Sequence, residues 1–270
     1  MWPERRHQDR GVADRVVAEI ERDGGVALAS HESVADPEGG EAIVRGAVER
    51  FGRLDAVVSN AGIFHTSPFD RLSPDEWRRM LNVHVDGGFY LSQPAFRVMK
   101  AQGYGRFVFI SSSAGIFGQA EAAHYAAAKA GLLGLTNVIA LEGEPHGVLA
   151  NTVLPTGFSR MVTATVGDRE QFPQETAFYD AIRPELVVPI VVYLAGRACD
   201  RTHQNYSASA GRYARAFVGL GDGWFAGPGS TPSADDIEDH LAEISGTESF
   251  TVPGSIYDEV ADVCALLGIG

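Results

Sequence analysis

Three side chains near the middle of the chain have the types and the spacing needed to transfer a proton to a carbonyl group. Tyr125 and Lys129 lie four residues apart, so on a helix they would share one face. A phenol has a pKa of about 10 and is a poor proton donor or acceptor near neutrality, and a nearby ammonium group lowers that pKa. Ser112 precedes the tyrosine by thirteen residues and can hydrogen-bond a carbonyl oxygen. Together they could hold a carbonyl or its alkoxide and move one proton, whereas a hydride must come from another molecule.

A tyrosine and a lysine at this spacing also occur by chance as a surface pair, which is the commoner explanation for the pair alone. The surrounding sequence argues against chance, because three further motifs occur in order around the pair. They are Asn60-Ala61-Gly62, the run FVFISSSAG at residues 107–115, and Pro155-Thr156-Gly157. Four ordered motifs within the length of one domain favour a reaction centre.

Helical and strand-like segments alternate along the chain, as in a parallel sheet with helices on both faces. We expect strands at the short apolar runs of residues 26–30, 54–59, 106–110, 148–154 and 206–208. We expect helices at residues 12–20, 42–51, 73–102, 122–142 and 184–197, where apolar residues recur at helical spacing. Ser73 followed by Glu76 is the capping-box pattern, which marks the start of the third helix.

The pattern loosens from about residue 211 onward. Glycines and a proline crowd residues 219–229, and two capped helices are expected at residues 233–244 and 255–267. We therefore predict an α/β domain over residues 1–210, with a Rossmann-like, doubly wound parallel sheet. Residues 211–270 are expected to form a C-terminal extension of helices and loops, packed on the domain or on a partner subunit.

The composition limits the classes of partner. The chain has 270 residues, 45% of them hydrophobic, and a formal net charge of −13, which suits a globular protein with one substantial core. An acidic chain repels phosphate backbones, so nucleic acid is a poor partner. The N-terminus lacks the apolar stretch of a secretory signal, and no apolar run is long enough to cross a bilayer. Cys199 and Cys264 give no disulfide framework and suit a reducing cytoplasm, where we expect the protein, and we expect no bound metal.

The ordered motifs resemble those of the short-chain dehydrogenase/reductase family over residues 11–212. Within that family, the chain most resembles the (3R)-hydroxyacyl-CoA dehydrogenase unit of peroxisomal multifunctional enzymes and their bacterial relatives. The strings that carry this closer resemblance are SVAD at residues 33–36, VHVDGGF at 83–89, GYGR at 103–106 and GLLGL at 131–135.

The resemblance implies an oxidoreductase that acts on a small-molecule carbonyl or secondary alcohol with NAD or NADP. Tyr125 would be the general acid/base, Lys129 its pKa partner and a contact to the ribose, and Ser112 the group that orients the carbonyl. The cofactor would be bordered by Asn60, Ala61 and Gly62, and its nicotinamide would lie near Pro155, Thr156 and Gly157. The resemblance also implies a homo-oligomer, formed through the helices at residues 73–102 and 122–142.

One departure from the family pattern is His84, which stands where the family usually has a catalytic asparagine. Asn82 is two residues away, about 200° around a helix, and cannot simply substitute. A histidine can donate or accept a hydrogen bond there, and the branch that this chain resembles also tends to carry one. A histidine that only packs between helices is an equally good explanation.

A second departure is that no Gly-x-x-x-Gly-x-Gly turn precedes Asn60. In the family this turn and the helix after it hold the pyrophosphate. The chain thus resembles a member that lacks its N-terminal βαβ unit, and the glycines at residues 219–223 lack the strand-turn-helix context that would replace it. The absent strands would lie between residues 26–30 and 54–59. Those two segments must pair directly, or the first must leave the sheet, or another chain must fill the gap.

Three functions therefore remain open from the sequence. The first is an NAD- or NADP-dependent oxidoreductase. The second is a cofactor-independent isomerase, dehydratase, cyclase or lyase that reuses Ser112, Tyr125 and Lys129 to stabilise an enolate or alkoxide. The third is a degenerate subunit in a hetero-oligomer with a full-length paralogue.

Overall fold

A computed structural model describes residues 10–159 and 173–269. Contacts divide the chain into two units, with the boundary after Arg215. The first unit contains a five-stranded sheet in the order β1-β2-β3-β4-β5, and the second contains a two-stranded sheet. No helix in the described part of the chain is long and apolar enough to cross a membrane.

The main sheet is parallel over its first four strands, as predicted. Its strands are β1 (Ala56–Ser59), β2 (Gly105–Ile110), β3 (Val148–Thr156), β4 (Gln204–Ser209) and β5 (Arg212–Ala216). The crossover helices are α3 (Pro74–Leu81), η1 (Asn82–Asp86), α4 (Gly87–Gln102), α5 (Ala114–Phe117), α6 (Ala123–Gly143), η2 (Glu144–His146), α8 (Pro173–Ala181), η4 (Pro184–Leu186) and α9 (Val188–Ala195). This arrangement confirms the predicted Rossmann-like α/β fold.

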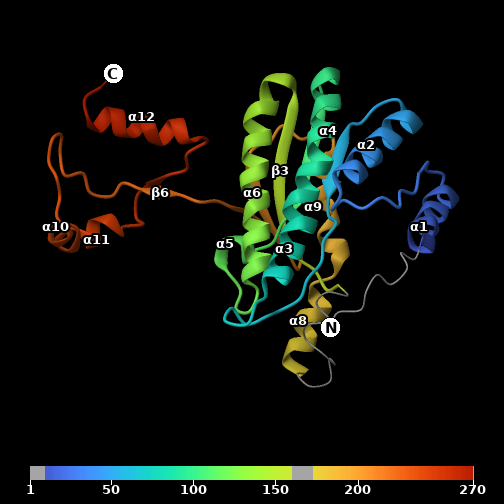
Figure 1. Cartoon of the computed structure of the whole chain (residues 1–270), viewed down its shortest axis with the longest axis horizontal. Helices are drawn as coiled ribbons and strands as arrows, with labels where there is room; N and C mark the ends of the chain where they lie inside the picture. Colours follow the sequence, from blue (N-terminus) through green and yellow to red (C-terminus); the bar gives the residue numbers. More distant parts are fainter. Residues whose placement is uncertain (1–9, 160–172, 270) are drawn as a thin grey trace. The chain divides into compact units, whose positions relative to one another are not determined.

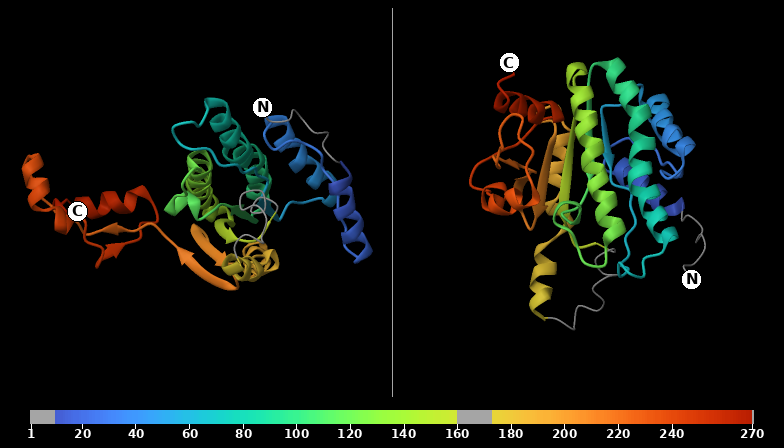
Figure 2. Two further views of the ribbon diagram at one scale, coloured as in Figure 1. Left: turned by 90° about the horizontal axis from the view of Figure 1, so that it is seen from below. Right: turned by 60° about the vertical axis from the view of Figure 1, so that its left-hand side comes forward.

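Helices cover both faces of the sheet (Figure 1, Figure 2). Strand β2 supplies side chains to the core on each face. Phe107 and Phe109 lie in a core with residues of α2 (Pro37–Phe51), α4 and α6. Val108 points to the opposite face and lies in a second core with Leu194 of α9. Burial on both faces explains why the sequence of β2 is a continuous apolar run and not an alternating one.

The long helix expected at residues 73–102 is present, but it is not uniform. Ser73 and Glu76 form the predicted capping box at its start. Between α3 and α4, however, η1 is a π-helical segment with the buried His84 at its centre. π-Helical turns hold an additional residue and are found frequently at functional sites.

The predicted strand at residues 26–30 is wrong. Helix α1 (Arg10–Arg22) is followed by Gly24 in the left-handed region, and residues 25–33 then continue as an irregular segment. Val26 and Leu28 are more than half exposed. Of the three possibilities, this segment leaves the sheet, because none of the described strands lies beside it to satisfy its backbone groups. Among the described residues, β1 is therefore an edge strand, and Val58 on it is 43% exposed.

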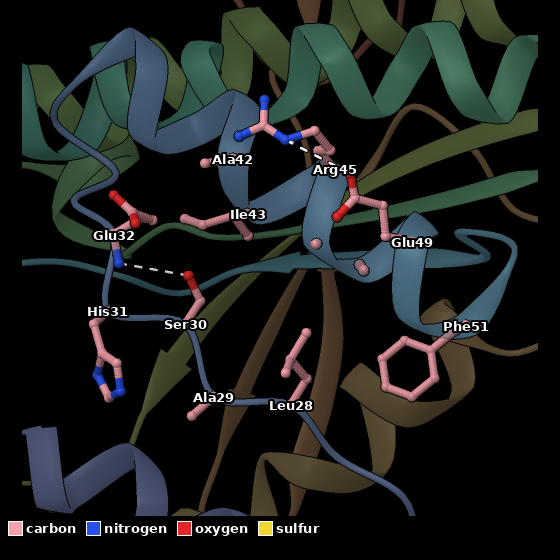
Figure 3. A pocket seen from close by; sticks show the side chains of 12 residues that line it. Leu28, Ala29, Ser30, His31, Glu32, Ala42, Ile43, Arg45, Glu49 and Phe51 are labelled. Carbon is pink, nitrogen blue, oxygen red and sulfur yellow. Dashed lines mark hydrogen bonds and ion pairs between the residues drawn. The ribbon is translucent and has the colours of Figure 1, made fainter.

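A cavity of about 520 Å³ lies between this irregular segment and α2 (Figure 3). Leu28 and Phe51 give it apolar walls, and Arg45 and Glu49 on α2 add a charged rim. None of the predicted catalytic residues lines it, so it is separate from the candidate site.

Two predicted segments differ in detail. Strand β4 is not the last one, because a two-residue turn at Ala210 and Gly211, both with positive φ, leads into β5 as in a hairpin. The segment at residues 219–223 contains β6 (Leu220–Gly221), which pairs antiparallel with β7 (Phe250–Thr251). The other elements of the second unit are the expected helical regions, α10 (Ala234–Asp239), α11 (Leu241–Ile244) and α12 (Ile256–Leu266).

Candidate active site

The predicted site motifs come together at the carboxyl edge of the sheet. In a parallel sheet the carboxyl ends of all strands lie at one edge, which is where α/β proteins bind ligands. Tyr125 and Lys129 lie in the first two turns of α6, which packs against β3. The residues at the strand ends are Asn60, Ala61 and Gly62 after β1, Ser112 after β2, and Pro155, Thr156 and Gly157 at the end of β3.

Lys129 is buried and fixed to the end of β2. Its Nζ atom donates a hydrogen bond to the carbonyl oxygen of Ile110 at 2.8 Å, and its own carbonyl oxygen accepts one from Ser111 Oγ at 2.7 Å. Only 4% of the residue is exposed. Because burial disfavours the charged form, the pKa of Lys129 is lowered to about 8.

The ring of Tyr125 is contacted by two other rings and by one cation. The Phe64 ring meets it edge-on at 4.8 Å between centroids, the His84 ring does so at 5.6 Å, and Lys129 Nζ lies over its face at 5.5 Å. Burial raises the pKa of Tyr125, and the nearby side chain of Ser112 acts in the opposite direction. Burial therefore outweighs the other influences on the pKa of Tyr125.

His84 is also buried and is held to the loop that follows β1. Its Nε2 atom lies 2.8 Å from the carbonyl oxygen of Ile63 and 3.2 Å from the Ile63 amide. The shorter contact favours an Nε2–H that donates to the oxygen, which leaves Nδ1 as an acceptor. Nδ1 is buried without a hydrogen-bond partner among the described residues. Burial and the charge of Lys129 lower the pKa of His84 to about 4, so its ring is neutral near pH 7.

Gly62 is needed for the close approach of His84. A Cβ atom added to Gly62 would lie 2.4 Å from Cε1 of the His84 ring, far inside van der Waals contact. The predicted Asn60-Ala61-Gly62 motif therefore meets the π-helical segment through this glycine, in addition to lying beside the strand end.

The sequence reasoning missed a second contact between the loop after β1 and the start of α6. His65 and His124 are the next residues after Phe64 and before Tyr125, and their Nε2 atoms lie 2.9 Å apart. His124 is fully buried. Its position beside Tyr125 was the available signal, but the two histidines are 59 residues apart and no local pattern connects them.

The residues present fit one end of a dinucleotide better than the other. Lys129, Tyr125 and the strand-end motifs could border a nicotinamide and its ribose, and the unpartnered Nδ1 of His84 provides an acceptor nearby. A strand, glycine-rich turn and helix of the Gly-x-x-x-Gly-x-Gly kind does not occur in residues 10–159 or 173–269. The same ranges contain no group of three or more His, Cys, Asp or Glu side chains that could hold a metal ion.

Comparison with known proteins gives consistent matches. Residues 6–171 match the family model described as short chain dehydrogenase. The chain is 41% identical over 199 residues to the peroxisomal multifunctional enzyme type 2 of Mus musculus, which covers 74% of this chain but only 26% of the mouse protein. It is 35% identical over 243 residues to a short-chain type dehydrogenase/reductase of Mycobacterium tuberculosis, covering 90% of this chain and 82% of that protein.

A solved structure shows the same likeness. The full-length peroxisomal multifunctional enzyme type 2 from Drosophila melanogaster superposes with a TM-score of 0.81 at 28% sequence identity. The superposition covers 95% of this chain and 44% of the Drosophila chain. This chain thus spans less than half the length of the two multifunctional enzymes.

Proposed function

Because the chain belongs to the short-chain dehydrogenase/reductase family, we propose that this oxidoreductase interconverts a carbonyl and a secondary alcohol with Tyr125 as the general acid/base. The observation that carries this proposal is the arrangement of three side chains at one edge of the sheet. The Ser112 side chain lies close enough to the phenol to lower the pKa of Tyr125, and Lys129 lies over the phenol ring while fixed to the adjoining strand end.

In the direction of reduction, the Ser112 hydroxyl donates a hydrogen bond to the carbonyl oxygen of the substrate. Tyr125 gives its proton to that oxygen as negative charge develops there, and takes the proton back in the direction of oxidation. A bound nicotinamide dinucleotide supplies or accepts the hydride at the carbonyl carbon. The raised pKa of Tyr125 keeps the phenol protonated, which suits reduction.

Lys129 and His84 support the tyrosine. Lys129 places a positive charge over the phenol ring, which opposes the effect of burial on a phenolate that forms during the reaction. His84 offers its buried Nδ1 as an acceptor for a water molecule, in the place where the family usually has an asparagine. We assign His84 this role because its other nitrogen is already held by Ile63.

NAD or NADP is the cofactor that we propose. Lys129 would contact the ribose. The residues that would border the dinucleotide are Asn60, Ala61 and Gly62, and those near the nicotinamide are Pro155, Thr156 and Gly157. Members of the family generally use NAD or NADP, which supports this assignment.

The proposal is tested with acetoacetyl-CoA as the carbonyl probe, and with NADH or NADPH as the reductant. Tyr125→Phe removes only the phenol oxygen and is expected to lower the rate by about 10²- to 10⁴-fold. Tyr193→Phe, on α9 at the opposite face of the sheet, is the matched control and keeps the rate. Full activity in Tyr125→Phe would contradict the proposal. If calorimetry detects no binding of either dinucleotide, yet depleted protein still converts a carbonyl substrate, the cofactor-independent alternative is correct.

We further propose a cytoplasmic homo-oligomer. Exposed apolar side chains on α4 and α6, namely Phe89, Val138 and Leu141, support association through these helices. The C-terminal extension is proposed to pack on the domain or on a partner subunit, since Ile256, Val260 and Val263 form an exposed apolar stripe on α12. Light scattering at micromolar concentration tests this, and a monomer would contradict it.

A second candidate function is a supporting subunit for a full-length paralogue. The observation that favours it is the outer edge of β1, which pairs with no described strand. Unpaired edges invite association with a strand from another chain. Co-purification with a full-length family member, together with no turnover by the chain alone, would favour this candidate over the first.

A further inference from the structure

His65 and His124 form a hydrogen-bonded pair beside Tyr125 that the proposed mechanism does not use. Their Nε2 atoms are 2.9 Å apart, and their rings meet edge-on at 4.4 Å between centroids. His124 lies in the first turn of α6, immediately before Tyr125, and is fully buried. His65 lies in the loop that follows β1.

The pair is one of three contacts that attach this loop to the start of α6. One residue earlier, Phe64 packs against Tyr125. Two residues later, the amide of Ser67 donates a hydrogen bond of 2.8 Å to the carbonyl oxygen of Glu121, just before α6. The loop is thus joined to α6 on both sides of the histidine pair, and Tyr125 lies within the joined region.

An Nε2-to-Nε2 hydrogen bond depends on how many protons the two rings carry. One nitrogen must donate and the other must accept, so a neutral pair can form the bond. A pair with one added proton can also form it, because the charged ring donates to the neutral one. Two added protons place N–H groups on both nitrogens, and the bond becomes a repulsive contact between two cations.

The two rings of the pair have different charges around them. Glu76 from α3 places a carboxylate oxygen 3.7 Å from His65 Nε2, and its other oxygen is held by Ser73. His124 lies at the positive end of α6, and burial, followed by the charge of His65, lowers its pKa. Among the described residues, Tyr125 adjoins His124 in the chain, Lys129 and His84 lie around the Tyr125 ring, and Glu121 lies three residues before His124.

We propose that His65 and His124 are positioning residues, whose hydrogen bond holds the loop after β1 against α6 and so fixes the phenol of Tyr125 until both rings are protonated. The catalytic part of this inference rests on the proposed role of Tyr125. The attachment of the loop to α6 does not, and it can be measured without turnover.

Hydrogen exchange of the peptide covering residues 60–73 measures the attachment directly. After correction for the intrinsic effect of pH, wild-type protection is expected to fall in acid as the second ring gains its proton. His65→Phe removes the bond and raises exchange about tenfold at pH 7, the effect of losing one hydrogen bond. His65→Gln can donate to a neutral His124 or accept from a charged one, so its protection is retained at both pH values. His146→Phe, in η2, is the control and leaves this peptide unchanged.

Turnover of acetoacetyl-CoA measures the effect on Tyr125. His65→Phe is expected to lower kcat about tenfold with little change in KM, because substrate binding is kept while the phenol is misplaced. His65→Gln is expected to restore kcat. It should also remove that part of the fall of kcat at acidic pH which is caused by protonation of both histidine rings. Exchange and pH profiles identical to wild type in both variants would overturn the inference. Activity that survives Tyr125→Phe would overturn the role of the tyrosine and leave the exchange result standing.

Discussion

The ammonium nitrogen of Lys129 donates a 2.8 Å hydrogen bond to the carbonyl oxygen of Ile110, the last residue of β2. The next residue, Ser111, returns a bond of 2.7 Å from its hydroxyl to the carbonyl oxygen of Lys129. Helix α6 and the end of β2 are therefore joined in both directions. Tyr125, one turn earlier on α6, consequently has a fixed position relative to Ser112.

The buried ammonium of Lys129 predicts a rise in stability at alkaline pH. The folded protein releases this proton near pH 8, whereas the unfolded chain keeps it to about 10.5. Unfolding therefore takes up a proton between these values, and the free energy of unfolding increases with pH across that window by up to about 3 kcal/mol.

Urea unfolding between pH 8 and 10.5 measures this rise. Lys129→Met should remove it, because the titrating group is gone. The chain contains one other lysine, the exposed Lys100 on α4, and Lys100→Met is the matched control that keeps the rise. Identical slopes in wild type and Lys129→Met would contradict the burial argument. With two lysines in the chain, nitrogen-15 labelling also resolves the titration of Lys129 directly.

The buried ring of His84 predicts a loss of stability at acidic pH. In the folded state this ring gains a proton only near pH 4, because its pKa is lowered to about 4, whereas in the unfolded chain it gains the proton near pH 6.5. The contribution to stability is complete above pH 6.5 and is lost as the pH falls to 4, at a cost of about 3 kcal/mol. The pKa of His124 is lowered too, so His84→Asn should remove part of the acid slope. His146→Asn should leave the slope unchanged, and urea midpoints at pH 7 and 5 measure both variants.

Gly62→Ala is expected to destabilise the fold. The new Cβ atom would lie 2.4 Å from the His84 ring, which is buried and held by Ile63, so relief requires a shift that costs about 1–3 kcal/mol. Thermal unfolding measures the loss. Gly134→Ala on α6 is the control, because its Cβ would meet nothing within 4 Å and the added methyl favours the helix.

A double variant tests the cause of the Gly62 effect. In the presence of His84→Ala the clash is absent, so Gly62→Ala should cost less than it does alone. Strict additivity of the two losses would show that the glycine serves some purpose other than the approach of the histidine ring.

Arg106 is expected to be the most important cation for stability. It is buried in β2, and its guanidinium donates to the carbonyl oxygens of Gly105, Gly147 and Cys199 at 2.8, 3.2 and 3.1 Å. Arg106→Met leaves those oxygens without these bonds and should lower the free energy of unfolding by about 2–4 kcal/mol. Arg197, which lies over the Tyr104 ring but is exposed, provides the control Arg197→Met with a loss below about 0.5 kcal/mol. Equal losses in chemical denaturation would contradict this difference.

The parts of the fold that the sequence predicted well are those set by local pattern. The capping box at Ser73, the apolar run of β2 and the four-residue spacing from Tyr125 to Lys129 each depend on neighbours along the chain. The strand at residues 26–30 was predicted wrongly, because a strand also needs a partner beside it. The His65–His124 pair was missed for a similar reason, since it joins segments that only the folded chain brings together.

The π-helical segment at His84 was missed for a different reason. The apolar residues recur at helical spacing both before and after this segment, in α3 and in α4. A single additional residue between the two helices therefore leaves no visible break in the pattern. The family resemblance placed His84 in the site, but the wider turn that carries it is a property of the backbone.

That wider turn changes how the helix responds to an altered chain length. Removing one residue from an ordinary α-helix rotates the segments on either side of it by about 100° against each other. The turn at Asn82–Asp86 already holds an additional residue, so it could lose one by closing to a regular α-helical turn. Met80 on α3 and Met99 on α4, both fully buried, would then keep their places. A one-codon deletion here would thus spare the flanking helices and change mainly the direction in which His84 points.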